Sequence, residues 1–429
     1  MFFHQCSGSR LRFCAAVGLV ILSIVSKEAF AQNSGQPLSL HQAITKTLAQ
    51  NPQLHQFNIK KDVLLGRRET SELTPALNVS IEVENFAGSG ELSGVTSAET
   101  TLALSSVIEL GGKRRARLSV ANAQLQTFDY HRQAFTLDVL GDLTSTFIQA
   151  LEVQALSELA VEARNLAQST LKIVKNRSNQ GAAPEYEVKR AKSTLSHSQL
   201  QVDALEQQFQ RLQIKIAAYW GETLPSWSKL DGDIYTYGTA SDFIALYERA
   251  KSSPAIAQFA SEARLKKAQV SLAKTQSKAD LGWQLGVRRF EDSGDTAFTA
   301  GVSIPLFSGK RNRGALKSAM ASENEVIYER QTALLKLHVQ LFEAYSQRQQ
   351  HVAAVKVFRT TILPDLNSAL ASTQRAYETG RYSYQDWIAA QKELLDAKRS
   401  LIESAAAASL NQAVIEQLIA EPLIAEPLN

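Results

Sequence analysis

Thiols are nearly absent from this chain. Its two cysteines, Cys6 and Cys14, lie near the amino terminus, and methionine occurs only at Met1 and Met320. Soft metal ions prefer thiolate and thioether ligands, so the sequence offers no cluster that would bind them. Disulfides and catalytic thiols are excluded from everything that follows Cys14. We therefore predict no metal site and no cofactor in the mature chain.

Long apolar runs are also missing. The run over 13–25 falls short of the roughly 20 residues that a membrane-spanning helix needs, and no later segment is long enough. It follows Arg10 and Arg12 and precedes Ala29-Phe30-Ala31, a pattern that predicts a cleaved signal peptide rather than a transmembrane anchor. Neither cysteine stands at the cleavage point, so we expect no lipidation. A mature chain that enters a membrane must do so with strands.

Signatures of catalysis and of nucleic-acid binding are missing as well. The seven histidines are scattered, and no Gly-x-Ser-x-Gly motif occurs. A net charge of +4 is too small and too dispersed to predict binding to nucleic acid. Glycine and proline are scarce, whereas long stretches are rich in Ala, Leu, Gln, Glu and Lys. This composition is typical of extended helices. Because no catalytic motif is present, we predict that the protein is not an enzyme.

The chain repeats itself at an offset of roughly 200 residues. Three landmarks recur in the same order: a polar residue and proline at 51–52 and 253–254, Gly-Lys-Arg at 112–114 and 309–311, and a glycine at 181 and 380 that is followed six residues later by an acid. Chance similarity between Ala-rich helices is the alternative. We predict a signal peptide over 1–31, a first repeat over 32–229, a second repeat over 230–420 and a tail over 421–429.

Each repeat is predicted to contain a helix, two strands and two long helices. Apolar and polar residues alternate over about 76–86, 98–109, 280–290 and 297–307, each near the roughly 9 to 11 residues that cross a bilayer as a tilted strand. Long helices are expected over about 113–177, 184–220, 310–361 and 383–420, with a kink at Pro364. The first would approach about 100 Å in length. A tube or coiled coil needs such a helix, and a globular core does not.

Four strands cannot close a barrel, and lipid does not tolerate an open sheet edge. Closure must therefore come from other copies of the chain. A dimer would supply eight strands, whose interior side chains would fill, whereas a trimer would supply twelve and leave a lumen. A conduit favours the trimer. We predict a mainly α fold with a β-barrel part: long antiparallel helices forming an α-barrel, and four membrane-spanning strands per chain.

These motifs resemble a known family. The duplicated plan, with Leu110-Gly111-Gly112-Lys113-Arg114 and Leu306-Phe307-Ser308-Gly309-Lys310-Arg311 closing the strand pairs, is similar to the TolC family of outer-membrane efflux proteins over essentially the whole mature chain. Glu82-Val83-Glu84-Asn85-Phe86, Ser97-Ala98-Glu99-Thr100-Thr101 and Ile108-Glu109 before the first closing motif resemble its CzcC-type, heavy-metal branch. Many relatives are lipoproteins, and this chain differs in having no cysteine at the cleavage site.

The resemblance implies a homotrimer in the outer membrane of a Gram-negative bacterium that extends into the periplasm. Its partners would be a periplasmic adaptor, an inner-membrane pump of the resistance-nodulation-division class, and outer-membrane lipid. The exported substrate would be a divalent heavy-metal cation. An exit channel for drugs or secreted polypeptides is the alternative within the family. A periplasmic adaptor or other soluble coiled-coil protein is a second alternative, which leaves the strands unexplained. An exported enzyme is a third, which lacks a convergent site.

Two sets of residues are candidates for specific roles. The helix reversals at Gly181 and Gly380, with Glu187, Val188 and Asp386, are where the family forms its periplasmic aperture and meets the adaptor. The alternative is that the glycines end helices and the acids favour the next helix start. Asp386 is our candidate for a constriction, because threefold symmetry would gather three carboxylates that bind cations.

The second set is a basic collar at the starts of two long helices, where the helix dipole disfavours positive charge. Some other interaction should offset this cost. Lipid phosphates of the inner leaflet are one candidate, and a solvated rim is the alternative. The collar comprises Lys113, Arg114, Arg115 and Arg117, and again Lys310, Arg311 and Arg313.

Overall fold

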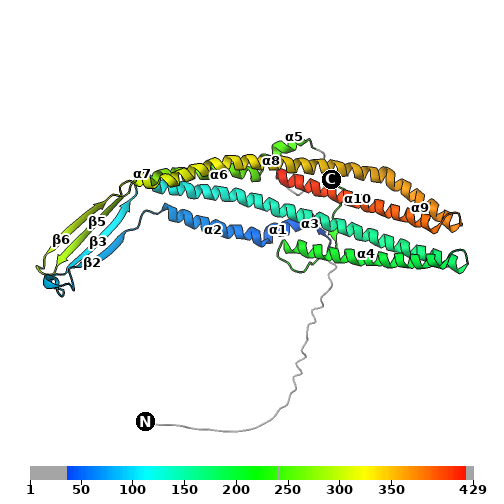
Figure 1. Ribbon diagram of the computed structural model, residues 1–429, viewed down its shortest axis with the longest axis horizontal. Helices are drawn as coiled ribbons and strands as arrows, with labels where there is room; N and C mark the ends of the chain where they lie inside the picture. Colours follow the sequence, from blue (N-terminus) through cyan, green and yellow to red (C-terminus); the bar gives the residue numbers. More distant parts are fainter. Residues whose placement is uncertain (1–35, 239–240, 422–429) are drawn as a thin grey trace, which may run out of the picture.

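The computed structural model describes residues 36–238 and 241–421. The predicted signal peptide over 1–31 lies outside these ranges, as does all but the first residue of the predicted tail. The described chain is mostly helical and strongly elongated (Figure 1). An antiparallel sheet forms one end of the molecule, and two helix reversals form the other.

Both halves of the chain follow one plan of two helices, two strands and a long helical hairpin, and in the second half the first arm of that hairpin is divided into several helices. The first half consists of α1 (Leu40–Gln50), α2 (Pro52–Glu72), β2 (Asn78–Glu84), a 3-10 turn (Gly90–Leu92), β3 (Glu99–Ile108), α3 (Lys113–Asn179) and α4 (Glu185–Ala218). The second consists of α5 (Phe243–Ala250), α6 (Pro254–Gln276), β5 (Leu281–Phe290), β6 (Thr296–Ser303), α7 (Ser308–Arg311), α8 (Arg313–Val357), α9 (Leu363–Glu378) and α10 (Tyr384–Ile419). Two short strands, β1 (Leu38–Ser39) and β4 (Leu230–Asp231), pair in parallel and connect the two halves.

Proline explains where the second half departs from the predicted boundaries. Strand β6 ends at Ser303 and not near 307, because Pro305 has no N–H to donate to a ladder. The helix expected from 310 is divided into α7 and α8 around Asn312. A π-helical segment, Phe358–Ile362, ends two residues before Pro364, where we expected a kink. In a regular α-helix the proline ring would clash with the carbonyl group four residues earlier, and the wider π turn relieves this clash.

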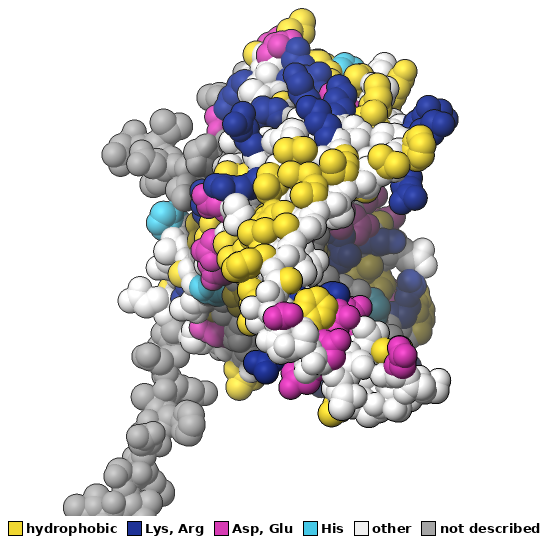
Figure 2. Space-filling model, turned by 90° about the vertical axis from the view of Figure 1, so that its left-hand side faces the viewer, with side chains coloured by type: hydrophobic (Ala, Val, Ile, Leu, Met, Phe, Trp, Pro, Cys, Tyr) yellow, Lys and Arg dark blue, Asp and Glu magenta, His cyan; other side chains and the backbone are white. Residues whose placement is uncertain are grey.

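The sheet has two chemically different faces. Its strands are antiparallel in the order β2-β3-β5-β6, and the register places Ile81 opposite Leu102, Leu102 opposite Val287 and Val287 opposite Phe298. These side chains share one face, and Ile81 and Phe298 are 72% and 92% exposed. Figure 2 shows apolar side chains gathered over the strands. Sheets in globular proteins bury such a face, so this one is built for an apolar surrounding.

The opposite face of the sheet carries mostly small and polar side chains, with Val107 and Phe290 as its larger apolar residues. Following the same register, its other residues are Asn78, Ser80, Glu82, Glu84, Glu99, Thr101, Ala103, Ser105, Gly282, Gln284, Gly286, Arg288, Ala297, Thr299, Gly301 and Ser303. Both outer strands, β2 and β6, keep one edge without a partner inside the described chain. The predicted alternation of apolar and polar residues therefore describes the faces of this sheet correctly.

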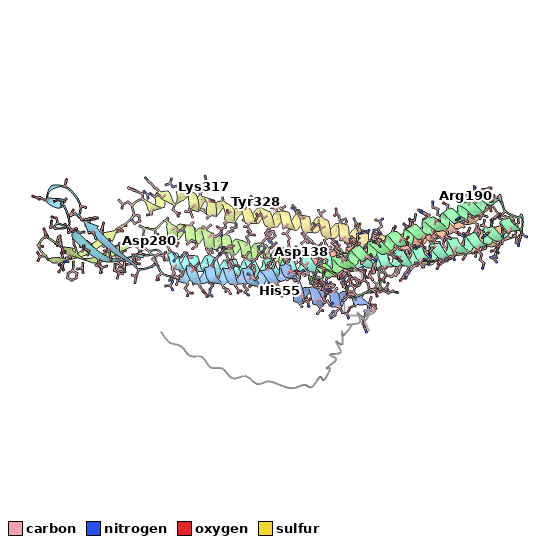
Figure 3. The ribbon with its side chains drawn as sticks, turned by 90° about the horizontal axis from the view of Figure 1, so that it is seen from below. His55, Asp138, Arg190, Asp280, Lys317 and Tyr328 are labelled. Carbon is pink, nitrogen blue, oxygen red and sulfur yellow. The ribbon has the colours of Figure 1, made fainter. Side chains whose placement is uncertain are left out.

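The helices lie side by side along the long axis. Helix α3 contains 67 residues, which corresponds to about 100 Å. It packs against α2 and α6 near the sheet and against α4 and α10 farther away, and α8 packs against α6 and α10 (Figures 1 and 3). Two sides of this helix layer have no neighbour in the described chain. One side runs along α2 and α4, and the other runs along α8 and α9.

The main apolar core lies at the middle of the molecule. Ile44 of α1 and Trp220 after α4 pack there with Leu143 and Phe147 of α3 and with Ile402 of α10. These side chains are almost completely buried, so the segments that flank α1 and α4 are fixed to the long helices. A second cluster fixes α5 to α8 and α10. The third cluster lies at the helix reversals and belongs to the site described below.

Candidate functional site

At the junction of sheet and helices, one carboxylate joins the two halves of the chain. Asp280, which precedes β5, accepts a hydrogen bond from the Leu110 N–H at 3.1 Å (Figure 3). Its carboxylate also forms an ion pair with the Lys113 Nζ at 2.6 Å. Arg117 donates to Glu109, with one of its nitrogens 2.9 Å from Oε2. Asp280 and Glu109 therefore offset the positive charge at the start of α3, where the helix dipole disfavours it.

The other members of the collar have different surroundings. Arg114, Arg115, Lys310, Arg311 and Arg313 are exposed, and they form no ion pair with another residue of the described ranges. Figure 2 shows basic side chains gathered at the top of the view, over the junction of sheet and helices and beside the apolar strands. The collar is therefore divided between two internal contacts and an exposed group that neighbours the apolar face.

A charged cluster lies on the polar face of the sheet, at the end away from the helices. Glu84 of β2 and Glu99 of β3 are directly opposite each other, a like-charge pair that destabilises a sheet by itself. Arg288 of β5 lies against both, with guanidinium nitrogens 2.8 Å from Glu84 and 2.7 Å from Glu99. It also donates to the Thr101 hydroxyl at 2.9 Å. Arg288 was not among the predicted site residues, because its partners depend on strand register.

Both helix reversals use glycine for its backbone freedom. Gly181 and Gly380 have φ values of +73° and +75°, a left-handed conformation that other residues adopt only with strain. In each reversal the residue after the glycine donates its N–H to a carbonyl of the preceding helix, Ala182 and Arg381 both at 2.8 Å. The glycines therefore end α3 and α9, as the helix-capping alternative expected. They also bring all the predicted aperture residues to one end of the molecule.

Asp386 has a structural contact of its own. Ser383 and Asp386 form a capping box at the start of α10, in which the Asp386 carboxylate accepts from the Ser383 hydroxyl at 2.7 Å and from its N–H at 3.1 Å. These hydrogen bonds lower the pKa of Asp386, so its carboxylate is ionised at neutral pH. The side chain is nevertheless on the surface. The Asp386 carboxylate therefore caps α10 and still faces solvent, where it can contact an ion or a partner.

The equivalent acid in the first repeat has a different environment. Pro184 occupies the place of Ser383 and has no hydroxyl, so Glu187 forms no capping box. Glu187 is 8% exposed and accepts a hydrogen bond from the Tyr377 hydroxyl at 2.9 Å. This contact connects α4 with α9. Burial raises the pKa of the Tyr377 phenol, and the hydrogen bond to Glu187 raises it further, so the phenol stays protonated at neutral pH.

Aromatic packing extends this contact across the tip. Tyr377 stacks on Trp387 of α10 with ring centroids 5.0 Å apart, and the Arg177 guanidinium of α3 lies 4.4 Å from the Tyr377 ring centre. Val188 packs at the edge of the same cluster. We name these residues, together with Glu187, the tip cluster. The tip cluster connects the α3–α4 hairpin to the α9–α10 hairpin.

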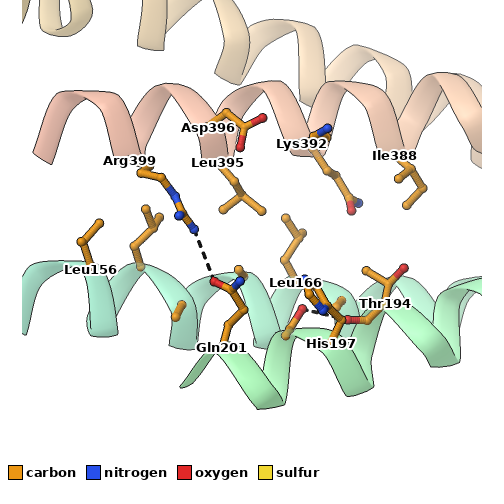
Figure 4. A pocket seen from close by; sticks show the side chains of 16 residues that line it. Leu156, Leu166, Thr194, His197, Gln201, Ile388, Lys392, Leu395, Asp396 and Arg399 are labelled. Atoms are coloured by element: carbon orange, nitrogen blue, oxygen red, sulfur yellow. Dashed lines mark hydrogen bonds between the residues drawn. The ribbon is translucent and has the colours of Figure 1, made fainter. Parts of the chain in front are cut away.

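An open groove lies between the same helices, nearer the middle of the molecule. Its volume is about 470 Å³, and its apolar lining includes Leu156 and Leu166 of α3 and Leu395 of α10 (Figure 4). Arg399 of α10 donates across it to Gln201 of α4 at 3.4 Å. The groove is thus an apolar surface with a polar rim on the tip half of the molecule.

Among the residues that the structure describes, no helix has both the length and the hydropathy needed to cross a membrane. Within the same ranges, the His, Cys, Asp and Glu side chains form no group of three or more that could hold a metal ion.

We predict that the Tyr377→Phe variant loosens the tip. Removing the hydroxyl leaves the buried Glu187 carboxylate without its donor, which typically costs about 1–3 kcal/mol. Hydrogen exchange of peptides covering 174–191 and 377–391 should accelerate by roughly tenfold. Tyr382→Phe is the matched control, because it removes a hydroxyl from the same reversal where the side chain is 55% exposed. Equal exchange in both variants and the parent protein would contradict a linking role for Tyr377.

Sequence comparison identifies relatives over most of the chain. The cobalt-zinc-cadmium resistance protein CzcC of Cupriavidus metallidurans is 22% identical, with 86% of this chain and 87% of that protein aligned. The pyoverdine export outer membrane protein OpmQ of Pseudomonas putida is 26% identical over 71% of this chain and 66% of that protein. The nickel-cobalt-cadmium resistance protein NccC of Alcaligenes xylosoxydans is 21% identical over 74% of this chain and 71% of that protein.

Solved structures share the fold at low sequence identity. The outer-membrane channel OprN superposes with a TM-score of 0.75 at 16% identity, covering 89% of this chain and 90% of that chain. CusC, whose structure concerns folding and transmembrane channel formation, superposes with a TM-score of 0.74 at 14% identity, covering 89% and 91%. The model of the family "Outer membrane efflux protein" matches residues 43–222 and 245–421, which confirms the predicted resemblance. This chain belongs to the outer membrane efflux protein family, a family of transport channels and not of enzymes.

Proposed function

We propose that this protein is the outer-membrane channel of a tripartite efflux pump of the resistance-nodulation-division class and that it exports divalent heavy-metal cations. One observation carries the channel part of the proposal: a four-stranded sheet with an exposed apolar face and two unpaired edges adjoins a bundle of long helices, of which α3 is about 100 Å long. In lipid, the edges of such a sheet need partners. Further copies of the chain supply them.

A homotrimer satisfies these requirements best. Three copies give twelve strands, enough to leave a lumen, with the apolar face toward lipid and the polar face inward. The helices support the same arrangement, because their unpartnered sides carry exposed apolar residues: Ile59 of α2 is 67% exposed, and Ile327 and Leu335 of α8 are 63% and 64% exposed. The exposed collar residues would then lie near the inner-leaflet phosphates of the outer membrane, without a lipid anchor on the chain.

The helix reversals are the proposed periplasmic aperture and adaptor contact. Gly181, Glu187, Val188, Gly380 and Asp386 lie at the end farthest from the sheet, where a channel through the outer membrane projects into the periplasm. The tip cluster holds the two hairpins of one copy together there. A periplasmic adaptor would contact this end and connect it to the inner-membrane pump. The nearby groove adds an apolar surface of the kind that helices of partner proteins use.

The substrate is inferred from relatives. CzcC and NccC are named for resistance to cobalt, zinc, cadmium and nickel, and the sequence motifs near Glu82 and Glu99 resemble that branch. OpmQ is named for export of pyoverdine, which favours a second candidate function: an exit duct for organic compounds or type I secretion substrates. Both candidates use the same channel architecture and differ in the pump that delivers the substrate.

We predict that the mature protein purifies in detergent as a trimer, because the sheet edges of one copy pair with those of the next. Native mass spectrometry of the extracted protein should give three chains per particle. A soluble monomer that needs no detergent would contradict the channel proposal. A detergent-dependent dimer would contradict only the twelve-stranded barrel.

We predict that deletion of the gene raises sensitivity to cobalt, zinc, cadmium, nickel or copper salts. Export across the outer membrane stops without the duct, so the growth-inhibiting concentration of at least one metal should fall. Complementation with the intact gene should restore growth and serves as the control. Unchanged metal tolerance together with new sensitivity to drugs or dyes would support the second candidate function.

We predict that Asp386→Asn reduces the cation preference of the channel in planar-bilayer recordings and weakens block by multivalent cations. Three ionised carboxylates gathered near the axis repel anions and attract cations, and asparagine removes their charge. Glu187→Gln should have a smaller effect, because that side chain is buried against Tyr377. Conductance, selectivity and block identical to those of the parent would leave Asp386 with its helix-capping role alone.

A further inference from the structure

Arg288 has no role in the function proposed so far, yet it lies at a sensitive place. In the proposed trimer, the polar face of the sheet lines the lumen, and the ends of the strands away from the helices form the outer mouth. We propose that Arg288 is a specificity-determining residue that keeps this mouth from binding divalent cations. This inference rests on the proposed function, because it requires the polar face to line a channel.

Glu84 and Glu99 are directly opposite on neighbouring strands, so their oxygens converge on one position. The Arg288 guanidinium occupies that position, with separate nitrogens 2.8 Å from Glu84 and 2.7 Å from Glu99. Asn85 also donates to Glu99 at 2.9 Å. The carboxylates are thus held together around a cation that belongs to the protein itself.

Without the guanidinium, these oxygens would form a ligand set for a divalent cation. Two carboxylates and the hydroxyl of Thr101, which now accepts from the Arg288 Nε, are hard oxygen ligands of the type that Ca²⁺ uses. Water from the lumen would complete the coordination. Such a site would retain divalent cations at the place where exported ions must leave and where external Ca²⁺ first enters. A duct conducts well only when ions bind weakly enough to leave.

The acids give the mouth a negative charge even while Arg288 occupies the space between two of them. Glu82 lies on the same face and has no ion pair within the described residues, so three carboxylates and one guanidinium leave a net charge of two negative. The mouth therefore attracts cations while its two convergent carboxylates stay occupied. Arginine suits this role because its planar fork bridges two carboxylates, whereas lysine offers a single point charge.

Planar-bilayer recordings of the purified trimer with Ca²⁺ on the outer side test the proposal. In Arg288→Gln, the half-blocking Ca²⁺ concentration should fall by at least roughly tenfold relative to the parent, because one opposing charge is lost beside a divalent ion. Arg289→Gln is the matched control. It removes the same charge from the next position of β5, which faces the apolar side, and should leave the Ca²⁺ block unchanged.

Further variants separate this role from a structural one. Arg288→Gln combined with Glu84→Gln and Glu99→Gln should restore the weak block of the parent, since the carboxylates are gone. If Arg288→Gln does not assemble, Arg288→Lys keeps the charge but not the fork, and its half-blocking Ca²⁺ concentration should be lower than that of the parent by less than roughly tenfold. A conducting parent whose Arg288 and Arg289 variants show equal Ca²⁺ block would overturn the inference. A parent that forms no channel at all would instead contradict the proposed function.

Discussion

Backbone groups at the edge of a sheet need hydrogen-bond partners wherever water is excluded, and this constraint governs the architecture of the chain. Strands β2 and β6 have free edges, and the sheet between them exposes apolar side chains on one face. Neither feature suits a monomer in water. The unpartnered sides of the helical part, with Ile59 on α2 and Ile327 on α8, have the same property. The sheet and the helices therefore both expose surfaces that lack a partner within the chain, and assembly of several copies would cover both.

Features with a short sequence period were predictable. The alternation around Ile81 and Phe298 correctly assigned side chains to the two sheet faces, because strand side chains repeat with a period of two. Proline and glycine indicated where the long helices end, because few other residues end a helix so reliably. Boundaries were less accurate: Pro305 should have ended β6 earlier than predicted. The capping box of Ser383 and Asp386 was also readable, because the serine lies three residues before the acid.

Contacts between distant parts of the sequence were not predictable. Asp280 meets Lys113 across 167 residues, and Tyr377 meets Glu187 across 190. Arg288 meets Glu84 across 204 residues. Each depends on strand register or helix rotation, which a single sequence does not specify. The basic collar illustrates the difference: its position at a helix start was visible, whereas its division into paired and exposed members required coordinates.

The divergence between the two helix reversals has a consequence for symmetry. A duplicated chain in three copies would present six similar hairpins around one axis, and the sheet and long helices preserve that near-equivalence. At the tips the two halves differ: Pro184 leaves Glu187 turned inward, whereas Ser383 holds Asp386 at the surface. In such a trimer, this difference would reduce the sixfold pseudo-symmetry of the tips to threefold. If the tips of such a trimer widened, the two hairpins of each copy would move by different amounts, because only the α3–α4 hairpin is bonded through its acid to the neighbouring hairpin.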